Sequence, residues 1–222
     1  MEGLYQNKYR IKSARLKGWD YGADAYYFVT ICIDAREHYF GRIMRDNGGD
    51  ASVALSEIGK IARDCYLEIP KHFEYVNLDA FIIMPNHIHG LIQICKHPQK
   101  RDDKNVIIAG DNKQSKSVSN PCGRDEALPR LYGDGERRTY IGKHPNMSKI
   151  SPKPKTLPVI IGSFKSIVTK KCNQQNLNFK WQTRYYDSIV RNEETLNRVR
   201  EYIKNNPKMW YRDRNNLQGI FM

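Results

Sequence analysis

The sequence lacks several features that would assign it quickly to a class of protein. No apolar run approaches the roughly 18 residues that a membrane-spanning helix needs. The first residues carry no apolar stretch of the kind found in secretory signals, so we expect a cytoplasmic protein. No GxxxxGK loop is present, which argues against a P-loop nucleotide site. The length of 222 residues suits one domain of ordinary size.

Cysteine is also sparse and shows no useful spacing. The chain has five cysteines, none in a CxxC pair: Cys32, Cys65, Cys95, Cys122 and Cys172. An odd number of widely separated cysteines argues against a disulfide framework and against a zinc knuckle. We therefore expect free thiols in a reducing compartment.

Positive charge is what the chain has in excess. Lys and Arg number 37 against 24 Asp and Glu, a net charge of +13. A field of this sign favours polyanionic partners, because each neutralised phosphate releases counterions. Nucleic acid is the expected class of partner, and a basic protein without any nucleic-acid role is the alternative.

Hydrophobic periodicity predicts an alternation of strands and helices. In chain order it predicts strand 26–34, helix 55–70, strands 75–85 and 87–94, helix 158–172, strand 181–190 and a final helix from 193 to about 206. Ser56 and Asn192 are the expected helix caps, and Pro70 the expected stop of the first helix. The βαββαβ order predicts a ferredoxin-like α+β sandwich, an antiparallel sheet with helices on one face, followed by a C-terminal helix.

We interpret residues 1–222 as a single domain with two irregular parts. Residues 1–25 are basic and lack periodicity, so they form an N-terminal extension. Residues 96–157 are rich in Lys, Asp, Gly, Ser, Asn and Pro, which predicts a long inserted loop.

Two histidines stand at strand spacing after Pro85 and Asn86. Residues i and i+2 of a strand point to the same face, so His87 and His89 project together. Two imidazoles on one face can act as two ligands of a divalent ion. An HxH pair alone is more often merely hydrogen-bonded, because two ligands seldom suffice.

The final helix carries a second pair of chemically useful residues. Tyr202 and Asn206 are one turn apart and share a face, so the Asn206 amide oxygen is a candidate third ligand. Tyrosine can form covalent intermediates, and a nearby cation stabilises its phenolate. Packing of Tyr202 in the core beside Val199 and Ile203 is the alternative. Asn206 precedes Pro207, which disfavours the α conformation at Asn206.

The order of these motifs resembles the Y1 tyrosine transposases of the IS200/IS605 type, in the HUH endonuclease superfamily. REP-associated tyrosine transposases are the most similar subgroup. The resemblance is carried by YYFVTICIDAREHYFG (26–41), LSEIGKIARDCYLEIP (55–70), LDAFIIMPNHIHGLI (78–92), IIGSFKSIVTK (160–170) and WQTRYYDSIVRNEETLNRVREYIKNNP (181–207).

The resemblance implies a function and a set of site residues. His87 and His89 match the metal-binding histidines, Tyr202 the nucleophile, and Asn206 the third ligand of Mg²⁺ or Mn²⁺. The implied reaction nicks and rejoins single-stranded or hairpin DNA through a 5′-phosphotyrosine. Both a monomer and a homodimer that exchanges the tyrosine helix are consistent with the resemblance.

Candidate DNA contacts come from three basic residues. Arg184 follows the WQ pair of the penultimate motif, Lys165 lies on the helix before it, and Arg15 belongs to the basic N-terminal stretch. For each of them, a merely solvated charge is the alternative.

Two other functions compete with a transposase. Replication initiators and relaxases of the same superfamily share the histidine pair and a tyrosine. A ferredoxin-like sheet can also bind RNA or hairpin DNA without catalysis, either as a dedicated binder or as an inactive copy.

Overall fold

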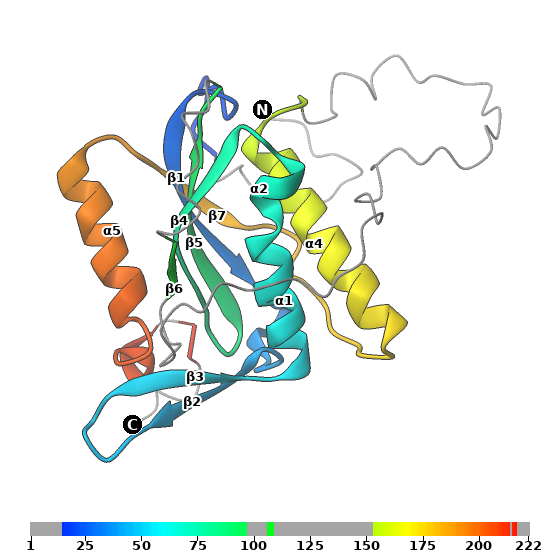
Figure 1. Ribbon diagram of the computed structural model, residues 1–222, viewed down its shortest axis with the longest axis vertical. Helices are drawn as coiled ribbons and strands as arrows, with labels where there is room; N and C mark the ends of the chain where they lie inside the picture. Colours follow the sequence, from blue (N-terminus) through cyan, green and yellow to red (C-terminus); the bar gives the residue numbers. More distant parts are fainter. Residues whose placement is uncertain (1–14, 97–105, 109–152, 214, 217–222) are drawn as a thin grey trace, which may run out of the picture.

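The computed structural model describes residues 15–96, 106–108, 153–213 and 215–216, which form an α+β fold around a twisted sheet (Figure 1). In chain order the elements are β1 (Ala25–Cys32), η1 (Asp34–Arg36), β2 (Gly41–Arg45), β3 (Ala51–Leu55), α1 (Glu57–Leu67), α2 (Ile69–His72), β4 (Val76–Ile83), β5 (His87–Ile94), β6 (Ile107–Ile108), α4 (Leu157–Gln174), β7 (Tyr186–Val190), α5 (Glu193–Asn205) and η2 (Trp210–Arg212).

The main sheet has the strand order β6-β4-β5-β1-β7. The pairs β4–β5, β5–β1 and β1–β7 are antiparallel, and the short β6 runs parallel to β4. Without β6 this is the strand order of a ferredoxin-like sandwich, so the predicted fold class is confirmed. Strands β2 and β3 form a separate hairpin that extends below the sheet in Figure 1.

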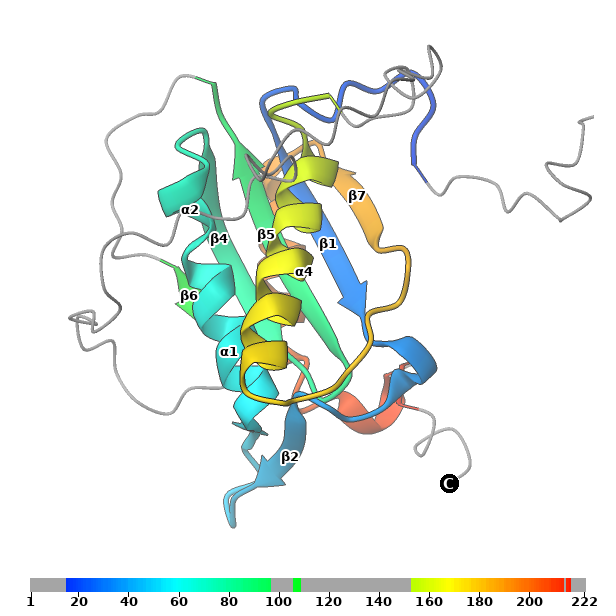
Figure 2. The same ribbon diagram turned by 90° about the vertical axis from the view of Figure 1, so that its right-hand side faces the viewer.

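Helices cover both faces of the sheet. Helices α1 and α4 pack side by side on one face (Figure 2), and α5 lies on the other (Figure 1). Successive side chains of β5 alternate between two cores: Ile88 and Ile92 face α1 and α4, whereas Leu91 belongs to the cluster under α5. Gly90 is required on the first face, because a Cβ there would overlap the hydroxyl of buried Tyr66.

Both predicted helix caps are present. The Ser56 hydroxyl accepts a hydrogen bond from the Gly59 backbone N–H at 3.1 Å, and the Asn192 side chain accepts one from Thr195 at 2.8 Å. These side chains satisfy N–H groups that have no partner within the first helical turn.

Pro70 does not stop a helix where the sequence predicted. Helix α1 ends at Leu67, and Pro70 lies in the first turn of the short helix α2. Proline is tolerated there because a first-turn N–H has no helical acceptor.

The predicted strand 181–190 is shorter than expected. Only Tyr186–Val190 forms β7, while Trp181 makes an isolated bridge to Ile33. Tyr186 pairs with Thr30, and Trp181 pairs with Ile33. Four residues, 182–185, therefore lie opposite only two residues of the β1 side, Ile31 and Cys32, so they cannot form a regular ladder with them. Arg184 therefore precedes the strand.

The two irregular parts are only partly described. Of the predicted N-terminal extension 1–25, residues 15–25 are described, and Ala25 is already the first residue of β1. Tyr21 is buried in the core, whereas residues 1–14 lie outside the described part. Most of the 96–157 insertion also lies outside it, but Ile107–Ile108 form β6. Among the described helices none is both long and apolar enough to span a membrane.

Candidate functional site

The two histidines meet on the sheet face that α5 covers. His87 and His89 are both buried on the central strand β5, and their Nε2 atoms lie 3.0 Å apart. The predicted shared face is confirmed, with Ile88 pointing into the opposite core.

The environment of His87 selects one tautomer of its ring. The Asn86 amide nitrogen donates to the carbonyls of Arg36 and Asn215, at 3.0 and 2.8 Å. Because both amide hydrogens are used, Asn86 Oδ1 accepts, and His87 Nδ1, 2.9 Å away, must donate to it. Neutral His87 therefore carries its lone pair on Nε2, the atom that faces His89.

His89 is held from two sides. Its Nδ1 lies 2.9 Å from the Thr30 hydroxyl on the neighbouring strand β1. The ring stacks on Phe28, with centroids 5.3 Å apart. These contacts leave Nε2 directed toward His87 and α5.

Tyr202 of α5 reaches the histidine pair. Its hydroxyl lies 3.2 Å from His89 Nε2, and its ring is perpendicular to the Phe28 ring, with centroids 5.9 Å apart. The side chain is 47% exposed, so it is not a core residue, in contrast to its neighbour Ile203, which is fully buried.

An ion pair fixes the position of α5. The Arg200 guanidinium makes two hydrogen bonds to the Asp79 carboxylate of β4, at 2.8 and 2.5 Å. Hydrogen bonding to Asp79 raises the pKa of Arg200. Because bidentate pairs are geometrically specific, this contact orients the helix turn that carries Tyr202.

Asn206 lies at the end of α5 with its side chain buried. It keeps α-helical angles (φ −57°, ψ −41°) in spite of the following Pro207. The residue is 3% exposed, and its Oδ1 has no hydrogen-bond partner among the described residues. A buried carbonyl oxygen without a partner is unfavourable, so this atom fits a cation ligand.

Asp213 is a candidate ligand that was not predicted from the sequence. It follows η2, and its Oδ2 lies 3.7 Å from His87 Nε2. Its Oδ1 accepts from the backbone N–H of Asn215 at 2.7 Å. Trp210 covers His87 in a stacked contact with centroids 6.0 Å apart. No periodic pattern follows Pro207, so nothing in the sequence marked this aspartate.

These groups form a donor set suited to a divalent ion. Ligand atoms of His87, His89 and Asp213 all lie within 4.8 Å of one another. Imidazole nitrogens and carboxylate oxygens suit Mn²⁺ and related first-row ions. His87 and His89 are buried on the central strand β5, and Asp213 follows η2.

The three predicted DNA contacts lie outside this cluster. Lys165 is on α4, across the sheet, where its amine donates to the Gln182 carbonyl at 2.6 Å; burial lowers its pKa. Arg15 donates to the Tyr185 hydroxyl at 3.1 Å, and Arg184 is exposed in the segment before β7. Their roles in DNA binding stay predictions.

Comparisons with known proteins give relatives but no family model. No family model matches the chain. A protein of Haemophilus influenzae (strain ATCC 51907 / DSM 11121 / KW20 / Rd), described as uncharacterized, is 28% identical over 203 residues, covering 91% of each chain. A solved structure of a REP-associated tyrosine transposase bound to a REP hairpin is 13% identical, with a TM-score of 0.43 over 90% of this chain and 72% of that chain.

Proposed function

We propose that this chain is a metal-dependent tyrosine transposase that nicks and rejoins single-stranded DNA, of the REP-associated type. One observation carries the proposal: the Tyr202 hydroxyl lies 3.2 Å from Nε2 of His89, which itself faces His87 Nε2 at 3.0 Å. The motif resemblance implies a tyrosine close to a pair of histidines, and Tyr202 lies in this way beside the buried His87 and His89.

The donor atoms fit a divalent ion held by His87, His89 and Asp213, with Asn206 as a further ligand. Two features support the fit, the His87 lone pair on Nε2 and the unsatisfied Oδ1 of buried Asn206. When bound, Mg²⁺ or Mn²⁺ would supply positive charge that polarises the scissile phosphate and offsets developing negative charge.

Tyr202 performs the covalent step in this proposal. Its oxygen attacks phosphorus, the bond from phosphorus to the 3′-oxygen breaks, and the products are a 5′-phosphotyrosine and a 3′-hydroxyl. Attack by another 3′-hydroxyl reverses these bond changes and joins new ends. The bond energy is kept in the intermediate, so the cycle needs no nucleotide. Phe28 and His89 hold the phenol ring in position.

The arrangement of the chain supports a complete site within one subunit. Tyr202 reaches His89 of its own chain, so exchange of the tyrosine helix in a homodimer is unnecessary for the reaction. The net charge of +13 suits a DNA substrate, and the motif resemblance favours a hairpin as its folded form.

Strand joining tests this function. The protein, incubated with Mn²⁺ and single-stranded hairpins from its own genome, should nick them and form a covalent protein–DNA band. An added strand with a free 3′-hydroxyl should then be joined to the released 5′ end. Nicking without joining would instead favour a replication initiator or relaxase, and tight hairpin binding without any nicking would favour a non-catalytic binder.

Substitution of Thr30 tests the proposed metal centre without changing any of the proposed ligands. Thr30→Val keeps the shape of the side chain but removes the partner of His89 Nδ1. Loss of such a supporting hydrogen bond should weaken Mn²⁺ binding by about 10–100-fold. Calorimetric titration measures the affinity, and Thr169→Val on α4, across the sheet, is the matched control. Equal affinities in the two variants would argue against His89 as a ligand.

A further inference from the structure

An exposed tyrosine beside the site is flanked by two arginines. Tyr211 of η2 is 47% exposed. The Cζ atoms of Arg45, from β2, and Arg212, from η2, lie 5.6 and 5.2 Å from its ring centroid. We call these three residues the Tyr211 platform. It joins two segments that are far apart in the sequence.

The two guanidiniums of the platform are available to bind an anion. Within the described part of the chain, neither Arg45 nor Arg212 has a carboxylate partner, whereas nearby Lys208 pairs with Asp50 at 2.6 Å. An arginine that stacks on a ring uses the face of its guanidinium and keeps the N–H groups at its edge for phosphate oxygens. The platform therefore combines an aromatic ring with two guanidiniums that have no carboxylate partner among the described residues.

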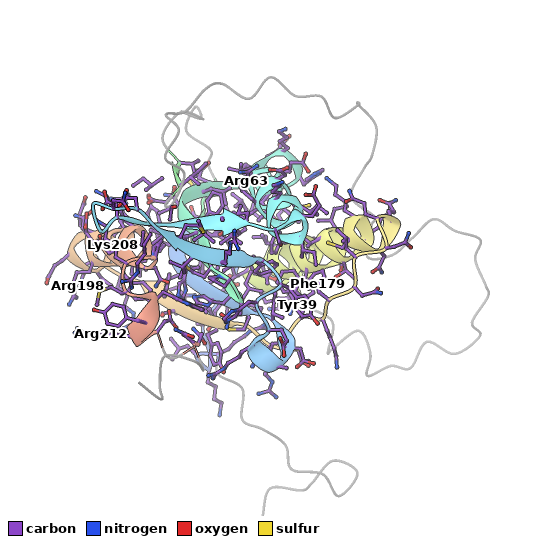
Figure 3. The ribbon with its side chains drawn as sticks, turned by 90° about the horizontal axis from the view of Figure 1, so that it is seen from below. Tyr39, Arg63, Phe179, Arg198, Lys208 and Arg212 are labelled. Carbon is purple, nitrogen blue, oxygen red and sulfur yellow. The ribbon has the colours of Figure 1, made fainter. Side chains whose placement is uncertain are left out.

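The platform continues directly into the candidate site. Its neighbours in the chain are Trp210, which stacks on His87, and Asp213, which lies 3.7 Å from the same histidine. In Figure 3, Arg212 and Lys208 lie toward one side of the molecule, away from Tyr39 and Phe179. A strand that crosses the platform would lead toward the histidines and Tyr202.

We propose that the Tyr211 platform binds the single-stranded DNA segment next to the scissile phosphate. A base stacks on Tyr211 in the place that one of the two guanidiniums occupies over the ring, and Arg45 and Arg212 then bind the phosphates on either side of that base. The inference rests on the proposed function and adds a specificity to it: bases inside a duplex are already stacked on each other, so the platform selects unpaired nucleotides.

The test measures binding separately from cleavage. Tyr211→Ala and Arg45→Ala are made in the full chain carrying Tyr202→Phe, and binding to a fluorescent oligothymidylate is measured by anisotropy without metal. Loss of one stacked base should weaken binding about 5–100-fold. Arg45→Ala should lower the slope of log affinity against log salt by about 0.7. Tyr211→Phe, which keeps the ring, should bind like its parent.

Matched controls remove an exposed tyrosine or a surface arginine elsewhere. Tyr39→Ala and Arg63→Ala, both marked in Figure 3, should leave the affinity unchanged. The proposal is overturned if the platform variants bind oligothymidylate as tightly as these controls, or if Tyr211→Ala weakens duplex binding equally. Either result leaves the proposed function standing, because Tyr211→Ala with an intact Tyr202 still forms the covalent adduct at saturating DNA.

Discussion

Replacing Tyr202 with phenylalanine should reduce DNA nicking by about a thousandfold or more, because removal of a covalent nucleophile eliminates the reaction path. The ring stays in place against Phe28, so folding and DNA affinity should be unchanged. Nicking of a labelled single strand with Mn²⁺, measured over time, gives the rate, and anisotropy gives the affinity.

Tyr186 provides the matched control for this change. It is 48% exposed, close to the 47% of Tyr202, and lies on β7 opposite Thr30, but no short contact joins its hydroxyl to the histidines. Tyr186→Phe should nick at the parental rate. A Tyr202→Phe protein that still formed adducts would show that another tyrosine is the nucleophile.

Alanine at His87 or His89 should have the second largest effect. Each change removes an imidazole ligand and leaves a buried space between β5 and α5, so nicking and Mn²⁺ binding should both fall by about a hundredfold or more. Calorimetry and the same nicking assay measure the two losses. An excess of chelator added to the parent protein should reproduce the loss of nicking.

His72 on α2, in the layer across the sheet, is the control for the histidine variants. His72→Ala should keep parental Mn²⁺ affinity and nicking. If His87→Ala bound Mn²⁺ as tightly as His72→Ala, the metal centre proposed here would be wrong, even with nicking reduced by some other cause.

The sequence was sufficient for those parts of the site that follow a local period. Strand alternation alone placed His87 and His89 on one face, and the structure confirms that placement with Ile88 on the other. Helical spacing placed Tyr202 and Asn206 one turn apart. The approach of Tyr202 to the histidines was predicted from the motif resemblance alone. Hydrophobic periodicity does not indicate which face of the sheet a C-terminal helix covers.

Features that depend on tertiary contacts were not predictable in this way. Asp213 approaches His87 only because the chain turns back after α5, through contacts of Trp210 and Asn215. Strands β2 and β3, which pair in a hairpin, were not among the elements predicted from the sequence. The shortening of the predicted strand 181–190 depends on its register with β1, which the sequence of one strand does not encode.

The fold explains how two distant segments produce one site. The antiparallel ladder fixes His89 against Thr30, and the Arg200–Asp79 pair holds α5 across the same face. Residues 113 positions apart in the chain thereby come within 3.2 Å. The stability of the α5 contact and the geometry of the candidate site are therefore linked in this protein.

The most direct measurement identifies the bond between protein and DNA. After reaction with a single-stranded hairpin and Mn²⁺, the adduct is digested with protease and nuclease, and the modified peptide is sequenced by mass spectrometry. We expect a nucleotide attached through its 5′-phosphate to Tyr202. Attachment to any other residue, or a nicked strand without a covalent adduct, would contradict it.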